Sequence, residues 1–172
     1  MNNFIFCPYC KSKLVNLEDY YHCPQCQKTI YKHSSITASI YPIKERKVLL
    51  SIRAVSPQKG KQDAIGGFLK YGEHPETGVL RESKEETNLN IKPIHLLGVY
   101  MDTHILKGIK RKTLNFFYIG KIISGNSKAS DDVKELFWQP IKTLPKNFGF
   151  RCCIDSYLDL QKWYNKPHRG VV

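Results

Sequence analysis

Five glutamates crowd into one short segment of a chain that is otherwise strongly basic. The 172 residues include 27 lysines and arginines against 15 acidic residues, a formal net charge of +12. The crowded five are Glu73, Glu76, Glu82, Glu85 and Glu86. Like charges so close together cost free energy unless a cation neutralises them. A set of oxygen ligands suits a hard divalent cation, so the segment suggests a site for Mg2+ or Mn2+.

The pattern around these residues predicts a helix. Pro75 suits a first helical turn, and the helix is expected to run to about residue 88. Glu82, Glu85 and Glu86 then stand at i, i+3 and i+4, so all three project from one face. A solvated, charged helix face would show the same spacing. On spacing alone, the metal site and the solvated face remain equally open.

Four of the six cysteines form two pairs, "CPYC" and "CPQC", with twelve residues between the pairs. This spacing is typical of a zinc ribbon, because a two-residue gap lets both sulfurs of a pair reach one ion. A segment this short has little core, so the metal is expected to supply most of its folding free energy. Four ligands fill the coordination sphere, so the zinc is predicted to be structural. The expected ligands are Cys7, Cys10, Cys23 and Cys26.

Other histidines and cysteines are expected to have structural roles. His22 and His33 are redundant as zinc ligands and are predicted to be exposed or to cap local structure. Cys152 and Cys153 have no partner pair. A buried structural role for at least one of them is favoured over a redox switch.

The elements that must position these residues follow from hydrophobic periodicity. Residues 56–63 are expected to be a polar loop, and the last helix, 151–164, should bury Ile154, Tyr157 and Leu158. Mixed strands with two principal helices predict an α/β or α+β sandwich around a mixed sheet. We expect residues 1–33 to form the ribbon and 34–172 the main domain. The predicted strands are 34–43, 47–54, a short one near 64–68, 94–105, 111–122 and 133–140.

Composition narrows the function classes. The basic charge favours a polyanionic partner such as a nucleotide, nucleic acid or anionic lipid, although a solvated lysine surface would account for it equally well. No signal-like apolar region and no membrane-spanning run is evident, so a cytoplasmic protein without membrane contact is expected.

The glutamate segment also resembles the Nudix box, G-x5-E-x7-R-E-U-x-E-E-x-G-U, in which U is a bulky aliphatic residue. Ser83 stands where an aliphatic residue is usual, which should weaken helix packing, and Asn88 replaces a glycine. Asn88 is a mild change because asparagine tolerates the left-handed conformation of a helix end. The similarity extends over about 34–165, although Gln62 and Ile65 stand where many members carry Trp and Pro. The matching positions are Gly67, Glu73, Arg81, Glu82, Glu85, Glu86 and Leu89.

The resemblance implies an α/β/α sandwich and attack of water on the diphosphate linkage of a nucleoside diphosphate joined to a group X. Glu82, Glu85 and Glu86, helped by the Gly67 carbonyl, would bind Mg2+ or Mn2+. One of these carboxylates, or a glutamate on a later loop, would deprotonate the water. The remaining candidates are Glu73 to hold the loop, Arg81 to orient the carboxylates, Glu135 as an additional metal or base residue, Arg53 for phosphate, and Phe68 and Tyr100 for base stacking.

A ribbon before such a domain is similar to the NADH pyrophosphatase group and its smaller ribbon-bearing relatives. The Ser-Gln-Pro-Trp-type signature of that group does not follow the box here, so NADH specificity is not expected. Dimers are common in that group, so a homodimer is an open expectation. The alternative is an RNA-binding protein or an enzyme that removes RNA 5′ caps. It would use the ribbon and the basic turn that contains Lys107, Lys110, Arg111 and Lys112.

Overall fold

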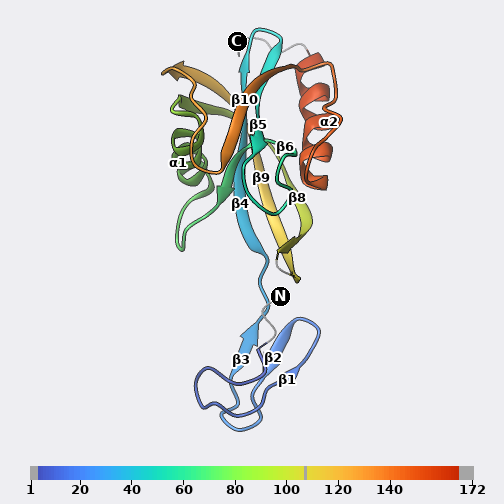
Figure 1. Ribbon diagram of the computed structural model, residues 1–172. Helices are drawn as coiled ribbons and strands as arrows, with labels where there is room; N and C mark the ends of the chain where they lie inside the picture. Colours follow the sequence, from blue (N-terminus) through green and yellow to red (C-terminus); the bar gives the residue numbers. More distant parts are fainter. Residues whose placement is uncertain (1–3, 107, 167–172) are drawn as a thin grey trace.

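The computed structural model describes residues 4–106 and 108–166, which form two separate sheets (Figure 1). The smaller sheet has three antiparallel strands in the order β1-β2-β3, which are Val15–Asn16, Tyr20–His22 and Thr29–Tyr31. The segment that forms this sheet also carries the two cysteine pairs. Its core is small and consists of Cys7, Leu14, Tyr21 and Cys23. Lys107, which belongs to the basic turn, lies outside the described residues.

The larger sheet has seven strands and is mixed, as predicted. Its main order is β10-β5-β4-β9-β8, with β6 paired to β5 and β7 paired to β4. The β4–β9 pair is parallel, whereas the other pairs are antiparallel. The strands are β4 Ser35–Lys44, β5 Lys47–Arg53, β6 Gln62–Asp63, β7 Ile65–Phe68, β8 Asn90–Leu106, β9 Ile109–Ser124 and β10 Val133–Pro140.

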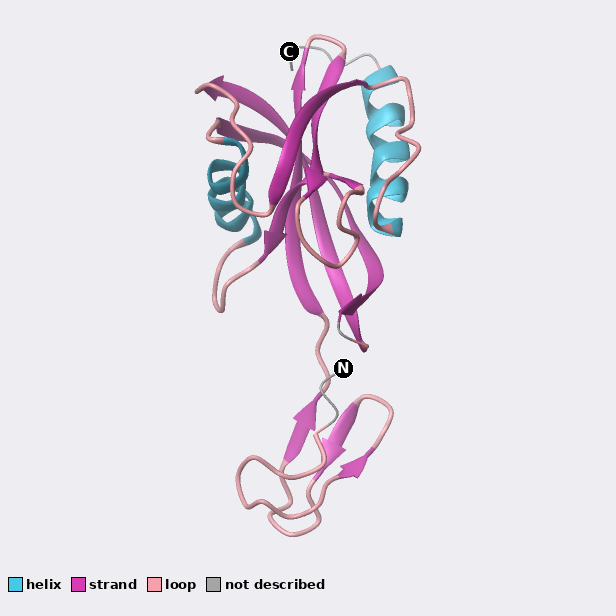
Figure 2. Ribbon diagram, in the orientation of Figure 1, coloured by secondary structure: helices cyan, strands magenta, loops and turns pink. Residues whose placement is uncertain are grey.

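Two helices, α1 (Pro75–Thr87) and α2 (Arg151–Asn165), cover opposite faces of this sheet (Figure 2). The two-residue period of the strands explains the two cores. On β5, Val48 and Leu50 face the α2 side, whereas Leu49 faces the α1 side. Both faces of the sheet are therefore buried, and the predicted α/β/α sandwich is confirmed. Within the described residues, neither helix is long and apolar enough to cross a membrane.

Strands β8 and β9 are longer than predicted. They form one antiparallel hairpin whose pairing runs from Asn90 opposite Ser124 to Leu106 opposite Ile109. Backbone pairing between the two strands continues beyond the stretch of alternating apolar residues, so periodicity alone missed their ends. The short β6 lies inside the predicted polar loop and pairs with the end of β5.

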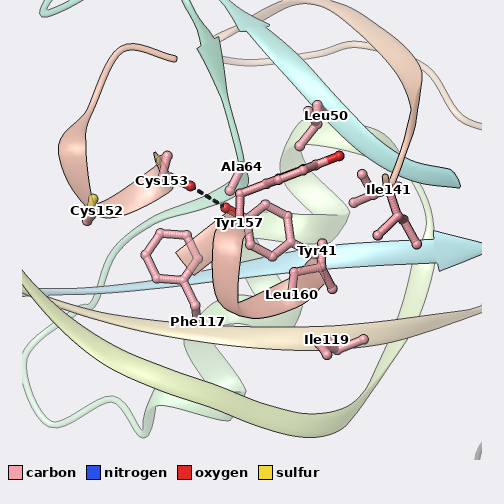
Figure 3. Close-up of a cluster of buried hydrophobic side chains, with 11 residues drawn as sticks. Tyr41, Leu50, Ala64, Phe117, Ile119, Ile141, Cys152, Cys153, Tyr157 and Leu160 are labelled. Carbon is pink, nitrogen blue, oxygen red and sulfur yellow. Dashed lines mark hydrogen bonds between the residues drawn. The ribbon is translucent and has the colours of Figure 1, made fainter. Parts of the chain in front are cut away.

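The buried face of α2 differs in part from the prediction (Figure 3). Tyr157 is fully buried as expected, but Leu158 is 38% exposed and Leu160 is fully buried in its place. The Tyr157 ring meets Tyr41 edge-on at 5.8 Å, and the Tyr41 hydroxyl donates to the Cys153 carbonyl at 3.2 Å. Removing a buried ring of this size from a packed core costs about 3–5 kcal/mol. The α2 helix is therefore held firmly against the sheet.

Candidate active site

The ends of α1 are fixed by local interactions. The first turn begins at Pro75, and the preceding His74 accepts the Glu76 N–H through Nδ1 at 3.3 Å. At the other end Asn88 adopts the left-handed conformation, with φ 58°, and its N–H donates to the Lys84 carbonyl at 3.0 Å. Asparagine thus ends the helix as the sequence predicted, and α1 has the length needed to present its carboxylates on one face.

Ser83 occupies the buried side of α1, where it is 1% exposed. Its hydroxyl donates to the Val79 carbonyl one turn earlier, so no buried polar group is left unpaired. The same side of the helix also buries Val79 and Thr87 against the sheet. The helix can therefore pack on the sheet although a serine stands where an aliphatic residue is usual.

A cleft of about 300 Å³ opens beside α1. It is bounded by β4, β7, α1, the loop before β10 and the start of α2. The fold brings together most of the residues that the sequence singled out. Those that line the cleft are Arg53, Gly67, Phe68, Glu82, Glu85 and Glu86.

Arg81 and Glu73 lie behind the cleft wall and fix the carboxylates. The Arg81 guanidinium donates to both Glu73 oxygens, to Glu82 at 2.6 Å and to Glu85 at 3.0 Å. Glu73 also accepts the Lys70 N–H at 2.8 Å, which closes the loop before α1. The Arg81 guanidinium lowers the pKa of Glu73 to about 2, and the Lys70 N–H adds to this effect.

Glu86 is a buried carboxylate, and Glu82 is a partly buried one. Burial raises the pKa of Glu82, and hydrogen bonds from Arg81 oppose this shift. Burial also raises the pKa of Glu86 well above its usual range, although the Gly66 N–H donates to its Oε2 at 2.9 Å. The neighbouring carboxylates of Asp63 and Glu82 raise the pKa of Glu86 further. A bound cation would relieve this cost in both residues.

The two glycines of β7 leave space for the carboxylates. A Cβ on Gly67 would lie 2.7 Å from the Glu82 carboxyl group. Gly66 has φ 142°, and a Cβ there would meet the Ala38 carbonyl oxygen at 2.2 Å. A side chain at Gly66 would collide with the backbone of β4, so this position requires glycine, whereas a side chain at Gly67 would displace the Glu82 carboxyl group.

The charge of the cleft is strongly unbalanced. Among its described lining residues are six carboxylates and a single guanidinium, that of Arg53. Arg53 is itself paired with Asp63, at 2.7 Å between Nη1 and Oδ2. The other five carboxylates belong to Glu82, Glu85, Glu86, Asp131 and Asp132. This oxygen-rich donor set fits Mg2+ or Mn2+ better than a softer metal.

Besides Glu73 and Arg81, two other predicted site residues do not line the cleft. The Tyr100 hydroxyl donates to Asp159 of α2 at 2.8 Å, and its ring packs edge-on against Phe117 at 5.5 Å. Glu135 is exposed on β10, opposite Ile52 of β5. Neither residue is among those that line the cleft. In place of Glu135, the loop before β10 contributes Asp131 and Asp132 to the cleft. The sequence analysis did not single out these two residues, although they stand only four and three positions before Glu135.

A buried polar network on the cleft floor was also missed. The Thr37 hydroxyl donates to the Asn115 Oδ1 at 2.6 Å, and the Asn115 amide donates to Thr113 at 3.1 Å. All three residues are buried: Thr37 is 7% exposed, Asn115 is 2% exposed and Thr113 is 0% exposed. The sequence could have indicated this network, because β4 and β9 carry polar residues at positions where an apolar core residue is expected. Because β4 and β9 run parallel side by side, the three side chains meet under the cleft.

The four paired cysteines converge at a separate site. Their sulfur atoms all lie within 4.8 Å of one another, with 3.6 Å between Cys7 and Cys26 and 3.5 Å between Cys10 and Cys23. A tetrahedron of zinc–sulfur bonds of ~2.3 Å has edges of ~3.8 Å, close to these separations. His22 and His33 do not belong to this group. The cluster is compatible with a zinc ribbon.

Comparison with known proteins identifies the family of this α/β/α sandwich and its carboxylate-lined cleft. The sequence model of the NUDIX domain matches residues 33–151. The chain therefore belongs to the Nudix family, as its glutamate segment suggested, and is a Nudix pyrophosphohydrolase.

Individual relatives agree with this assignment. An ADP-ribose pyrophosphatase of Methanocaldococcus jannaschii is 34% identical over 137 residues, which is 79% of this chain and 78% of that protein. A NUDIX hydrolase structure from Nitrosomonas europaea shares the fold, with a TM-score of 0.76, 23% identity and 95% of each chain covered. A MutT NUDIX hydrolase from Burkholderia pseudomallei has a TM-score of 0.66 at 20% identity, over 75% of this chain and 99% of that one.

Proposed function

We propose that this enzyme hydrolyses the diphosphate linkage of a nucleoside diphosphate joined to a group X, with Mg2+ or Mn2+ as its cofactor. ADP-ribose is the first substrate to test, because the M. jannaschii relative is named an ADP-ribose pyrophosphatase. The observation that carries the proposal is the charge of the cleft, whose described lining residues include six carboxylates and one guanidinium. A diphosphate would be repelled from this cleft unless divalent cations lay between the two sets of negative oxygens.

Within the proposal, α1 has the central role. Glu82, Glu85 and Glu86, with the backbone of Gly67, would hold the divalent ions. Ions bound there would neutralise charge in the transition state and lower the pKa of a bound water. Arg81 and Glu73 would hold the carboxylates in position, because one guanidinium contacts Glu73, Glu82 and Glu85 at once. The candidate proton acceptors are the α1 carboxylates and Asp131.

Substrate contacts would come from two other residues that line the cleft, Arg53 and Phe68. Arg53 presents a fixed guanidinium, held by Asp63 and by the Pro57 carbonyl at 2.8 Å, which suits a phosphate oxygen. Phe68 lines the cleft and is 49% exposed, so its ring is free to stack on a base. Tyr100 is left out of the proposed substrate contacts because its hydroxyl is bonded to α2.

A hydrolysis screen tests the proposal. Purified enzyme would be given ADP-ribose, NADH, FAD, dinucleoside polyphosphates, oxidised dNTPs and capped RNA, each with Mg2+, with Mn2+ and with EDTA. We expect hydrolysis of at least one nucleoside diphosphate derivative, with AMP among the products of ADP-ribose, and no turnover in EDTA. Turnover that survives EDTA would contradict the metal role. Cleavage of capped RNA and of no other substrate would instead support the RNA-decapping alternative. The feature that favours this alternative is the basic end of the β8–β9 hairpin, with Arg111 and Lys112.

We further propose that residues 1–33 form a zinc ribbon and 34–172 the hydrolase domain. The start of the family match at residue 33 supports this boundary. The ribbon's zinc would be structural, because its four sulfurs leave no position for a water. A homodimer and a cytoplasmic location stay predictions, to be tested by light scattering and by cell fractionation.

A further inference from the structure

Three metal-binding side chains of different types converge at the cleft, and none of them belongs to the α1 carboxylates or to the four-cysteine site. A carboxylate oxygen of Asp102, a ring nitrogen of His104 and the Cys152 sulfur all lie within 4.8 Å of one another. Asp102 and His104 are two residues apart on β8, so they point to the same face of the sheet. Cys152 lies in the first turn of α2, which packs against β8.

The His104 ring is held in place and has an unpaired nitrogen. It stacks on the Phe150 ring, with 4.2 Å between centroids and 26° between planes. Its Nε2 is buried and has no hydrogen-bond partner among the described residues. Buried polar atoms without a partner are rare in native proteins, and a bound ion is one kind of partner that such an atom can have. The proposed hydrolysis assigns no role to this nitrogen, and packing in the core gives it no hydrogen-bond partner among the described residues.

Asp102 is positioned by backbone donors. Its Oδ1 accepts the Thr103 N–H at 2.6 Å, and its Oδ2 accepts the Cys152 N–H at 3.0 Å. The second bond caps α2, whose N-cap residue Phe150 supplies no side-chain hydrogen bond. The Cys152 side chain also hydrogen-bonds this carboxylate, which offers about four lone-pair positions, so at least one position stays available. Ligating carboxylates are commonly oriented by hydrogen bonds of this kind, so the capping role and a ligand role are compatible.

We propose that Asp102, His104 and Cys152 form a transition-metal site for Zn2+ or a divalent ion of similar chemistry. Oxygen, nitrogen and sulfur donors together suit zinc, whereas the oxygen-only α1 cluster suits magnesium. Three protein ligands leave a fourth position open. His104 and Cys152 both line the cleft, so this position faces it and takes water or a nitrogen or oxygen atom of a molecule bound there.

The neighbouring Cys153 is a natural control. It is 2% exposed, against 3% for Cys152, but its thiol donates to Asp63 at 3.1 Å and lies outside the three-residue group (Figure 3). Substitution of either cysteine by serine changes the same buried turn of α2. Only the change at Cys152 removes a proposed ligand.

Cobalt titration tests the site. Protein whose four-cysteine site is already filled with zinc, as counted by elemental analysis, would be titrated with Co2+ in buffer free of Mg2+. We expect one equivalent to bind with the strong visible bands of four-coordinate Co2+ and a sulfur-to-cobalt charge-transfer band. Co2+ on the α1 carboxylates would give no sulfur band. Added imidazole should shift the visible bands, because the fourth position is open; unchanged bands would overturn that feature.

The variants then assign the ligands. His104→Phe keeps a ring stacked on Phe150 but removes both nitrogens, and Cys152→Ser removes the sulfur. Each should weaken Co2+ binding by at least tenfold, and Cys152→Ser should abolish the sulfur band, whereas Cys153→Ser should match the unaltered protein. A sulfur band that survives Cys152→Ser, or binding that is equally lost in Cys153→Ser, would overturn the proposal.

A measurement on the unaltered chain covers the case in which a variant does not fold. Native mass spectrometry with added Zn2+ and excess Mg2+ should show two zinc ions per chain, one in the four-cysteine site and one in the proposed site. A single zinc ion would overturn the proposal.

Discussion

Arg81 and Glu73 form a two-pronged ion pair, with 2.9 Å between Nε and Oε1 and 2.8 Å between Nη2 and Oε2. Two parallel N–H···O bonds join the planar guanidinium to the carboxylate, and such bidentate pairs are among the strong side-chain ion pairs. The remaining nitrogen of Arg81 contacts both Glu82 and Glu85. One residue thus connects the loop before α1 to the carboxylates that face the cleft.

This pair predicts a specific pH dependence of stability. The pKa of Glu73 is lowered from an ordinary 4.5 to about 2, chiefly by Arg81, so its charge stabilises the folded state at pH values above 4.5. That contribution should fade as the pH drops from 4.5 towards 2. Denaturant unfolding of the unaltered enzyme and of Glu73→Gln should therefore differ at neutral pH and converge in acid. A difference that stays constant over this range would contradict the assignment.

Activity should depend on the α1 carboxylates that face the cleft. Glu85→Gln and Glu86→Gln keep the side-chain shape and remove a charge, so the fold should survive. We expect kcat to fall by two or more orders of magnitude, roughly 3 kcal/mol of transition-state stabilisation. Glu76 is the matched control, because it lies on the exposed first turn of the same helix and does not line the cleft. Equal losses in Glu76→Gln and Glu86→Gln would count against the metal role.

The loop before β10 gives a second paired comparison. Asp131 lines the cleft, whereas Glu135 is exposed on β10 and does not. Asp131→Asn should lower kcat at least tenfold and raise the Mg2+ concentration needed for half-maximal rate. Asparagine tolerates the left-handed backbone of this position, where φ is 54°, so the loop should keep its shape. Glu135→Gln should leave both parameters within about twofold; the reverse result would restore Glu135 as the loop carboxylate.

The four-cysteine site should hold one zinc ion that does not take part in the chemistry. Elemental analysis of Cys23→Ser should show that zinc lost, and the ribbon segment should unfold because it has little core of its own. Hydrolysis of ADP-ribose with Mg2+ should continue at a measurable kcat while the larger domain stays folded. Complete loss of turnover in a folded domain would give the zinc a chemical role.

The sequence by itself determined the features that depend on short-range geometry. The two-residue gaps within the cysteine pairs bring two sulfurs to one ion whatever the rest of the chain does. The i, i+3 and i+4 spacing places Glu82, Glu85 and Glu86 on one side of any α-helix. Pro75 and Asn88 mark the ends of that helix through local backbone preferences. These features and strand periodicity predicted a sandwich around a mixed sheet, and the resemblance to the Nudix box then favoured the carboxylate face of the helix as a metal site over a solvated face.

Only the tertiary structure decided which distant residues join that centre. The register of β10 on β5 leaves Glu135 outside the cleft, while Asp131 in the preceding loop lines it. Asp102 and Cys152 lie 50 residues apart, and they meet only because α2 returns to cover β8. Strand register, bulges and helix docking are set by the packing of the whole core, which periodicity along the chain does not report.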